Sequence, residues 1–210
     1  MAGRVITVAQ QKGGAGKTTL LAHLAVAFRR RGLSVAALDA DPQGSLSLWA
    51  RQREANVGDD LSVLSGEGLE LGREAARLKR AHDLVLIDSP PHTQDAPQQA
   101  IGAADLVIVP VQPSPMDLWA TRPTLVLAAK AKKPILLVLN RMPPRGRLAD
   151  EIAQLLASFQ VPIAATRLGN RTAFAAALSE GKAVGELSPR GLAAREMGAL
   201  ADEIAAMVGI

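Results

Sequence analysis

The sequence contains no cysteine and no tyrosine, and aromatic residues make up only 2% of its 210 positions. The absence of cysteine excludes disulfide bonds, thiolate metal sites and a cysteine nucleophile, and the absence of tyrosine excludes tyrosine phosphorylation. No apolar run approaches the roughly 18 to 20 residues that a membrane-spanning helix needs, and no secretory leader opens the sequence. These absences predict a cytoplasmic protein.

The composition is that of a single globular domain. Hydrophobic residues make up 48% of the chain, and a chain of this length can bury one core without dividing. We therefore expect one domain over residues 1–210, without internal repeats or a long linker. The 24 Lys and Arg exceed the 20 Asp and Glu, which gives a formal net charge of +4. This balance permits contact with nucleic acid or anionic lipid, but it also fits a merely solvated surface.

Short apolar runs alternate with helix-like stretches along the chain. This alternation predicts an α/β fold, a doubly wound and mostly parallel sheet with helices on both faces. The apolar runs predict strands at 5–10, 35–39, 61–64, 84–88, 106–111, 135–140 and 161–164. The stretches between and after them predict helices at 17–31, 45–54, 69–81, 116–131, 148–159, 172–180 and 191–208. Because ligands of such sheets bind at the carboxyl ends of the strands, polar residues there are candidate site residues.

The segment after the first predicted strand has the spacing of a phosphate-binding loop. It reads Gln11-Lys12-Gly13-Gly14-Ala15-Gly16-Lys17-Thr18-Thr19. Glycines let the backbone fold tightly around an anion, and the amide hydrogens and dipole of a helix start favour phosphate. We expect ATP to bind at residues 13–19, with Lys17 neutralising the β- and γ-phosphates and the Thr18 hydroxyl coordinating Mg²⁺. Thr19 is expected to support the loop.

Gln11 stands where the common phosphate-loop pattern has glycine, and a second lysine, Lys12, follows it. In these two features the segment resembles the deviant Walker A motif of the ParA/MinD superfamily of P-loop NTPases. The resemblance implies an ATPase that hydrolyses ATP to ADP and phosphate. It also implies that the chain forms a homodimer on binding ATP, in which Lys12 reaches across the interface to the partner's nucleotide.

Carboxylates end two further predicted strands. The segment from Asp39 through Asp41 to Gln43 resembles the switch I segment of this superfamily, and the apolar run that ends at Asp88 resembles its Walker B motif. By resemblance, Asp41 positions the attacking water, while Asp39 and Asp88 support Mg²⁺. Positioning and charge stabilisation supply most of the catalysis in phosphoryl transfer. Taken alone, either segment also fits an ordinary strand end followed by a turn.

The segments at 107–114 and 137–141 resemble the two later strand ends that hold the nucleobase in the superfamily, and Asn140 ends the predicted strand at 135–140 in the second segment. The amide offers both a donor and an acceptor, so it can read an adenine edge. Alternatively, Asn140 is only a polar residue that caps the strand and does not contact a base. The resemblance covers residues 4 to about 141 and continues more weakly to the C-terminus.

Missing residue types also exclude several branches of the superfamily. Nitrogenase iron proteins and arsenite-pump ATPases need cysteines, and the bacterial tyrosine kinases need tyrosines, so the composition excludes all three. MinD-type proteins end in a basic amphipathic helix that lies on the membrane. The last predicted helix carries three acids and no basic residue after Arg195, which predicts no membrane attachment. The sequence most resembles the short ParA-type partition and positioning ATPases.

These relatives bind DNA without sequence preference in the ATP state, and a partner protein stimulates their hydrolysis. The resemblance therefore implies a nucleoid-associated protein that positions a cargo, whose identity the sequence does not specify. Phosphate contacts by arginine would make such binding depend strongly on salt. The candidate DNA contacts are Arg145, Arg147, Arg167 and Arg171. A MinD-like membrane-associated regulator and a metabolic ATP-dependent transferase or ligase of the superfamily are the alternatives.

Overall fold

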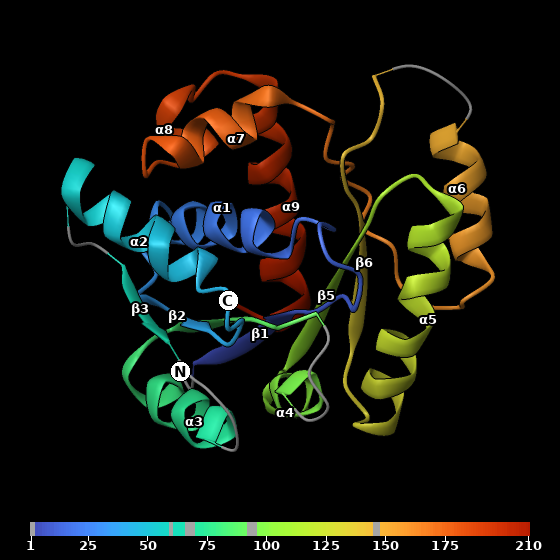
Figure 1. The fold of residues 1–210 in the computed structure, drawn as a ribbon, viewed down its shortest axis with the longest axis horizontal. Coiled ribbons are helices and arrows are strands. Elements are labelled where there is room, and N and C mark those ends of the chain that lie inside the picture. The colour runs from blue at the N-terminus through green and yellow to red at the C-terminus, as the bar shows by residue number, and fades with distance from the viewer. Residues whose placement is uncertain (1–2, 59–60, 66–69, 92–95, 145–147) are drawn as a thin grey trace.

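The computed structural model describes residues 3–58, 61–65, 70–91, 96–144 and 148–210, which form a sheet covered by helices (Figure 1). The strands are β1 (Arg4–Val8), β2 (Val35–Asp39), β3 (Ser62–Ser65), β4 (Leu84–Asp88), β5 (Leu106–Val111) and β6 (Ile135–Leu139). They form a six-stranded sheet in the order β3-β2-β4-β1-β5-β6. Every pair of neighbouring strands is parallel.

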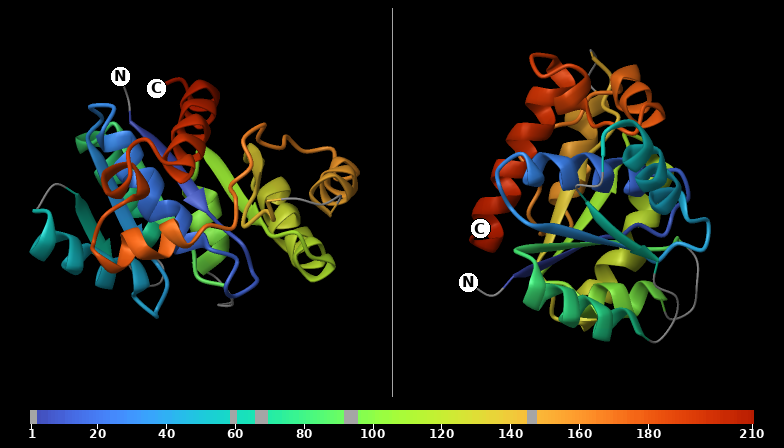
Figure 2. Two further views of the ribbon diagram at one scale, coloured as in Figure 1. Left: turned by 90° about the horizontal axis from the view of Figure 1, so that it is seen from above. Right: turned by 90° about the vertical axis from the view of Figure 1, so that its left-hand side faces the viewer.

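Helices lie on both faces of this sheet, as Figures 1 and 2 show. They are α1 (Lys17–Arg29), α2 (Ser45–Asn56), α3 (Leu71–Ala81), α4 (Ala96–Ala103), α5 (Pro115–Lys130), α6 (Leu148–Ala157), α7 (Thr172–Ser179), α8 (Val184–Leu187) and α9 (Leu192–Val208). Helices α1 and α9 cover one face, and α3 and α4 cover the other. The start of β1 and the end of α9 lie side by side (Figure 2). None of the described helices has both the length and the apolar composition needed to cross a bilayer.

Successive residues of the strands point to opposite faces of the sheet, as the two-residue repeat of a strand requires. In β1, Ile6 and Val8 belong to the cluster formed with α1 and α9, whereas Val5 packs with α3 and α4. All residues of β2, β4, β5 and β6 are buried, which explains why these strands read as continuous apolar runs. Burial on both faces fixes the positions of the strand ends, where the candidate site lies.

The predicted α/β fold is confirmed, and the bounds predicted for β2, β4 and β5 match the structure. The strand predicted at 161–164 is wrong, because only Ile163 forms an isolated bridge there, with Leu137. Pro162 has no N–H to continue the ladder, so a strand does not develop at this edge. Two short helices, α4 and α8, were not predicted, since each has too few residues for a helical repeat to stand out.

His23 ties the buried helix α1 to the C-terminal helices. The Val184 N–H donates to Nδ1 of His23 at 3.2 Å, so the neutral ring carries its proton on Nε2, which lies 3.2 Å from the Phe174 carbonyl oxygen. Burial lowers the pKa of His23 to about 4, although the Phe174 carbonyl and the Glu186 carboxylate favour the charged ring. The neutral imidazole is therefore the form that fits the fold.

This histidine makes folding stability depend on pH. Its folded pKa lies below the ordinary value of 6.5, so its contribution is complete above pH 6.5 and is lost as the pH falls toward 4. We expect the wild-type chain to lose about 2 kcal/mol more unfolding free energy between pH 7 and pH 5 than a His23→Gln variant, whose amide does not titrate. Urea unfolding of both proteins at the two pH values measures this difference. Parallel losses in the two proteins would contradict the assignment.

Candidate functional site

The candidate site lies where β1, β2 and β4 end. The register pairs Val8 with Asp88 and Asp39 with Asp88, so the last residues of these three strands lie side by side, with neighbouring strands about 4.8 Å apart. The structure therefore brings two of the predicted carboxylates, Asp39 and Asp88, to one edge of the sheet. The phosphate loop leaves β1 at the same edge and leads directly into α1.

The backbone of this loop has a conformation that glycine favours. Gly14 and Gly16 have φ angles of 76° and 91°, in the left-handed region that residues with a Cβ atom rarely adopt. Gly16 is the N-cap of α1, and no side chain caps this helix start. The first N–H groups of a helix have no partner within the helix, and with the helix dipole they form an anion site.

Lys17 is the first residue of α1, and its side chain is only 6% exposed. Its ammonium forms no hydrogen bond or ion pair with any residue that the structure describes. Burial lowers the pKa of Lys17, while the charges of Asp88 and Asp41 raise it. Together with Thr18, Thr19 and Asp41, it lines a cavity of about 600 Å³ that includes Gly13, Gly14 and Gly16 of the loop. A buried cation that lines such a cavity is suited to an anionic ligand.

Thr18 and Asp88 fit a magnesium ion. The Thr18 hydroxyl donates to Oδ2 of Asp88 at 2.6 Å, and Oδ1 of Asp88 is buried without a hydrogen-bond partner. Burial raises the pKa of Asp88 to about 7, and the Thr18 hydrogen bond opposes this effect. Among the described residues, no group of three or more His, Cys, Asp or Glu is placed to hold a metal ion by itself. Mg²⁺ needs no such cluster, because it takes one or two carboxylates together with phosphate and water oxygens.

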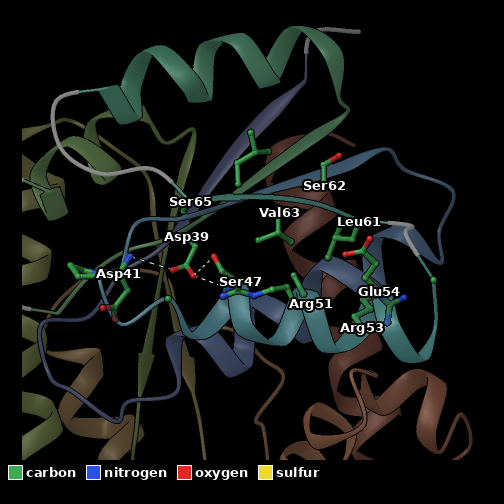
Figure 3. A pocket seen from close by; sticks show the side chains of 15 residues that line it. Asp39, Asp41, Ser47, Arg51, Arg53, Glu54, Leu61, Ser62, Val63 and Ser65 are labelled. Carbon is green, nitrogen blue, oxygen red and sulfur yellow. Dashed lines mark hydrogen bonds between the residues drawn. The ribbon is translucent and has the colours of Figure 1, made fainter.

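Asp39 uses its carboxylate to fix the start of α2 (Figure 3). Oδ2 accepts hydrogen bonds from the backbone N–H and the hydroxyl of Ser47, both at 2.8 Å. Oδ1 accepts a longer bond, 3.3 Å, from the Asp41 N–H. In this conformation Asp39 organises the turn that carries Asp41, and its support of Mg²⁺ stays a prediction.

Asp41 lies between two cavities. It lines the cavity of the phosphate loop with Lys17 and Thr18, so a water that it orients there can approach a bound phosphate. It also lies at the end of a second cavity of about 700 Å³ between α2 and β3, which Figure 3 shows. Oδ1 of Asp41 accepts a hydrogen bond from the Gln43 N–H at 3.0 Å, which holds the turn. Its predicted role in positioning water is compatible with this location.

Lys12 forms an ion pair with Asp117 of its own chain. The Asp117 side chain is 1% exposed and also accepts a hydrogen bond from the hydroxyl of Ser114, the N-cap of α5. The sequence analysis missed Asp117, although the segment from Ser114 to Asp117 matches the broader capping pattern of a helix start, in which Ser or Thr is followed three residues later by Asp or Glu. That pattern predicts where α5 begins, but it does not predict that this helix start lies beside Lys12.

Two side-chain amides contact the phosphate loop. Asn140, predicted to read the base, donates from Nδ2 to the Ala15 carbonyl at 3.0 Å. Gln112, which lies in the other segment predicted to hold the nucleobase, donates from Nε2 to the Gly14 carbonyl at 2.7 Å. Asn140 also lines a smaller cavity of about 290 Å³ with Asn170. This cavity adjoins the phosphate-loop cavity, since both include Gly16, Thr19 and Arg141.

The four arginines predicted to contact DNA have different positions. Arg171 pairs with Glu196, with Nε and Oε2 at 3.0 Å, and this carboxylate raises the pKa of Arg171. Arg167 also has a partner within the chain. Arg145 and Arg147 lie outside the described residues. DNA contact by these residues therefore stays a prediction, and at Arg171 it would compete with an internal ion pair.

Comparison with known proteins gives relatives along the whole chain. "Maintenance of carboxysome distribution protein A" of Halothiobacillus neapolitanus is 32% identical over 197 residues, which cover 91% of each chain. "Chromosome-partitioning ATPase Soj" of Thermus thermophilus is 31% identical over an alignment 240 positions long, gaps included, which covers 98% of this chain and 96% of the relative. The crystal structure of the cell division ATPase MinD from Pyrococcus furiosus has a TM-score of 0.79 and 26% identity, covering 98% of this chain and 99% of that one.

A family model agrees with these similarities. The model described as "CobQ/CobB/MinD/ParA nucleotide binding domain" matches residues 6–184, which include the phosphate loop, Asp39, Asp88 and Asn140. The match extends over most of the chain and includes β2 to β6 and the end of β1. The chain therefore belongs to the CobQ/CobB/MinD/ParA nucleotide-binding family.

Proposed function

We propose that this chain is an ATPase that dimerises on binding ATP, binds DNA without sequence preference in that state, and partitions or positions a cargo. A partner protein stimulates the hydrolysis of ATP to ADP and phosphate. The observation that carries the proposal is the phosphate loop with two lysines, of which Lys17 is buried and lines the loop cavity, and Lys12 forms an ion pair with Asp117. Two relatives named for carboxysome distribution and chromosome partitioning support the proposed class of cargo movement.

The residues of the site divide the work of phosphoryl transfer. Lys17 neutralises the β- and γ-phosphates, and Thr18 and Asp88 hold Mg²⁺ at the end of β4. When bound, Mg²⁺ supplies positive charge that offsets the charge on the phosphate oxygens. Asp41 orients the attacking water from the turn that Asp39 fixes. Because the protein forms no covalent bond to the phosphate in this reaction, positioning and charge stabilisation supply most of the rate enhancement.

The ion pair between Lys12 and Asp117 has a consequence for dimerisation. In the proposed dimer Lys12 contacts the partner's nucleotide, so it must leave the Asp117 carboxylate of its own chain. Leaving a buried carboxylate unpaired is costly, and the phosphates of the partner's nucleotide offer the lysine a compensating charge. Dimerisation is then favoured by the phosphates of a bound nucleotide, which is the behaviour of a nucleotide-controlled switch.

Lys12 is proposed to act in dimerisation and not in binding the nucleotide of its own chain. We expect a Lys12→Ala variant to stay monomeric with Mg·ATP while it still binds nucleotide, because Lys17 and the loop backbone are unchanged. Light scattering with size-exclusion chromatography, with and without ATP, measures the change. A Lys130→Ala variant, which removes an exposed lysine from the far end of α5, is the matched control and should dimerise. ATP-dependent dimers of the Lys12 variant would contradict the role assigned to it.

Asp41 is expected to act in hydrolysis and not in assembly. An Asp41→Ala variant should still form ATP-dependent dimers that bind DNA, while its turnover falls by about 100-fold or more, the usual loss when a group that activates the nucleophile is removed. Steady-state phosphate release with ATP, DNA and the activating partner measures the turnover. An Asp202→Ala variant removes an exposed acid that pairs with Arg31 and should leave the rate unchanged. Normal turnover in the Asp41 variant would defeat its proposed role.

DNA binding needs its own measurement. Fluorescence anisotropy with a random duplex should show binding with ATP and little with ADP, and the logarithm of the affinity should fall linearly with the logarithm of salt concentration. Flotation with anionic vesicles and ATP is the matched comparison. Vesicle binding without DNA binding would replace the proposal with a membrane-associated regulator. Rapid turnover with a small carboxylate or amine substrate, without DNA or a protein partner, would replace it with a metabolic transferase or ligase.

A further inference from the structure

Two amides from neighbouring strand ends hold consecutive peptide groups of the phosphate loop. Gln112 follows β5 and bonds the Gly14 carbonyl, and Asn140 follows β6 and bonds the Ala15 carbonyl. Strand β5 lies between β1 and β6 in the sheet, so both amides reach the loop from the same side. These contacts join residues 98 and 125 positions apart in the sequence.

The position of each carbonyl fixes the direction of the next N–H. In a trans peptide group the C=O and the N–H point in opposite directions. The Gly14 carbonyl shares its peptide group with the Ala15 N–H, and the Ala15 carbonyl shares its group with the Gly16 N–H. When both oxygens are held toward β5 and β6, both N–H groups face away from these strands. Successive N–H groups aligned in this way form a concave site for an anion.

The Asn140 side chain is itself fixed at both of its polar atoms. Its Oδ1 accepts a hydrogen bond from the Arg141 N–H at 2.9 Å, and its Nδ2 is the donor to Ala15. The side chain is only 9% exposed. A Cβ atom at Gly16 would lie 2.7 Å from Nδ2, so a side chain there would push the Asn140 amide off the loop, and the φ angle of Gly16 itself favours glycine. The amide is packed against the loop and has little freedom to turn toward a base.

We propose that Gln112 and Asn140 are positioning residues that set the phosphate loop in its anion-binding conformation before the nucleotide arrives. Asn140 acts on the phosphates through the loop, whereas the sequence analysis predicted that it reads adenine. The inference rests on the proposed binding of a nucleoside triphosphate at this loop. Donors that are already aligned need no reorganisation on binding, which is why their alignment contributes to affinity.

A ligand without a base distinguishes the two roles of Asn140. Isothermal titration calorimetry with Mg·ATP, Mg·GTP and Mg·tripolyphosphate should show that Gln112→Ala and Asn140→Ala each weaken all three ligands by a similar factor of about 10, the effect of one hydrogen bond. The ratio of ATP to GTP affinity should stay at its wild-type value. If Asn140→Ala weakens ATP alone and leaves tripolyphosphate unchanged, Asn140 reads the base and the proposal is overturned for it.

Asn170 supplies a matched control. Its amide also lines the smaller cavity, but its side chain forms no hydrogen bond within the described ranges of the chain. An Asn170→Ala variant should bind tripolyphosphate with wild-type affinity. An equal loss in this variant would show that any amide near the cavity has the effect, which contradicts a specific role of the loop contacts.

The measurements also separate this inference from the proposed function. A wild-type chain that binds neither ATP nor tripolyphosphate would defeat nucleotide binding itself. A wild-type chain that binds both, with Gln112→Ala and Asn140→Ala binding as tightly, would defeat only the positioning role. Gln112 is partly exposed, so its alanine variant should keep the thermal unfolding midpoint of the ligand-free protein. The Gln112 measurement stands even if the variant of the more buried Asn140 does not fold.

Discussion

The rest of the site depends on the Lys17 ammonium, which lies buried at the start of α1 without a partner among the described residues. A buried cation is costly unless a negative charge compensates it, and the carboxylates of Asp88 and Asp41 oppose the effect of burial on the pKa of Lys17. The arrangement is stable because the sheet is buried on both faces and fixes the strand ends that carry these groups. A phosphate group would give this ammonium a direct partner, which is the physical reason that this edge of the sheet suits a nucleotide.

The turn that carries Asp41 is connected to the C-terminal helices by contacts through α2. Asp39 fixes the start of α2, and α2 carries Arg53, whose buried guanidinium pairs with Glu186 and lies 5.8 Å from the ring centre of Trp49. Trp49 in turn lines the cavity of the phosphate loop. If this turn moved when the γ-phosphate is bound or lost, α2 would transmit the movement to α7 and α8, which it contacts. Such coupling is what a protein needs if its surface is to report the state of its nucleotide.

The sequence predicts most of the sheet, because buried parallel strands such as β4 and β5 are continuous apolar runs. It also predicts the phosphate loop, whose glycines and lysines are adjacent in the chain. It does not predict the contacts of Lys12 with Asp117, of Gln112 with Gly14 or of Asn140 with Ala15, since each joins residues about a hundred positions apart. The strand expected at 161–164 fails for a local reason, the missing N–H of Pro162, whose effect depends on the neighbouring strand. Contacts between segments that are distant in the sequence thus form the part of the site that the sequence does not predict.

A crystal structure of the chain with Mg²⁺ and a non-hydrolysable ATP analogue tests the central claim most directly. We expect the triphosphate to lie in the loop between β1 and α1, with Lys17 on its β- and γ-phosphates, Mg²⁺ beside Thr18 and Asp88, and Lys12 released from Asp117 to contact the nucleotide of a second copy. A nucleotide bound elsewhere, or a loop that stays without phosphate in such crystals, would contradict the claim that this turn grips a nucleoside triphosphate.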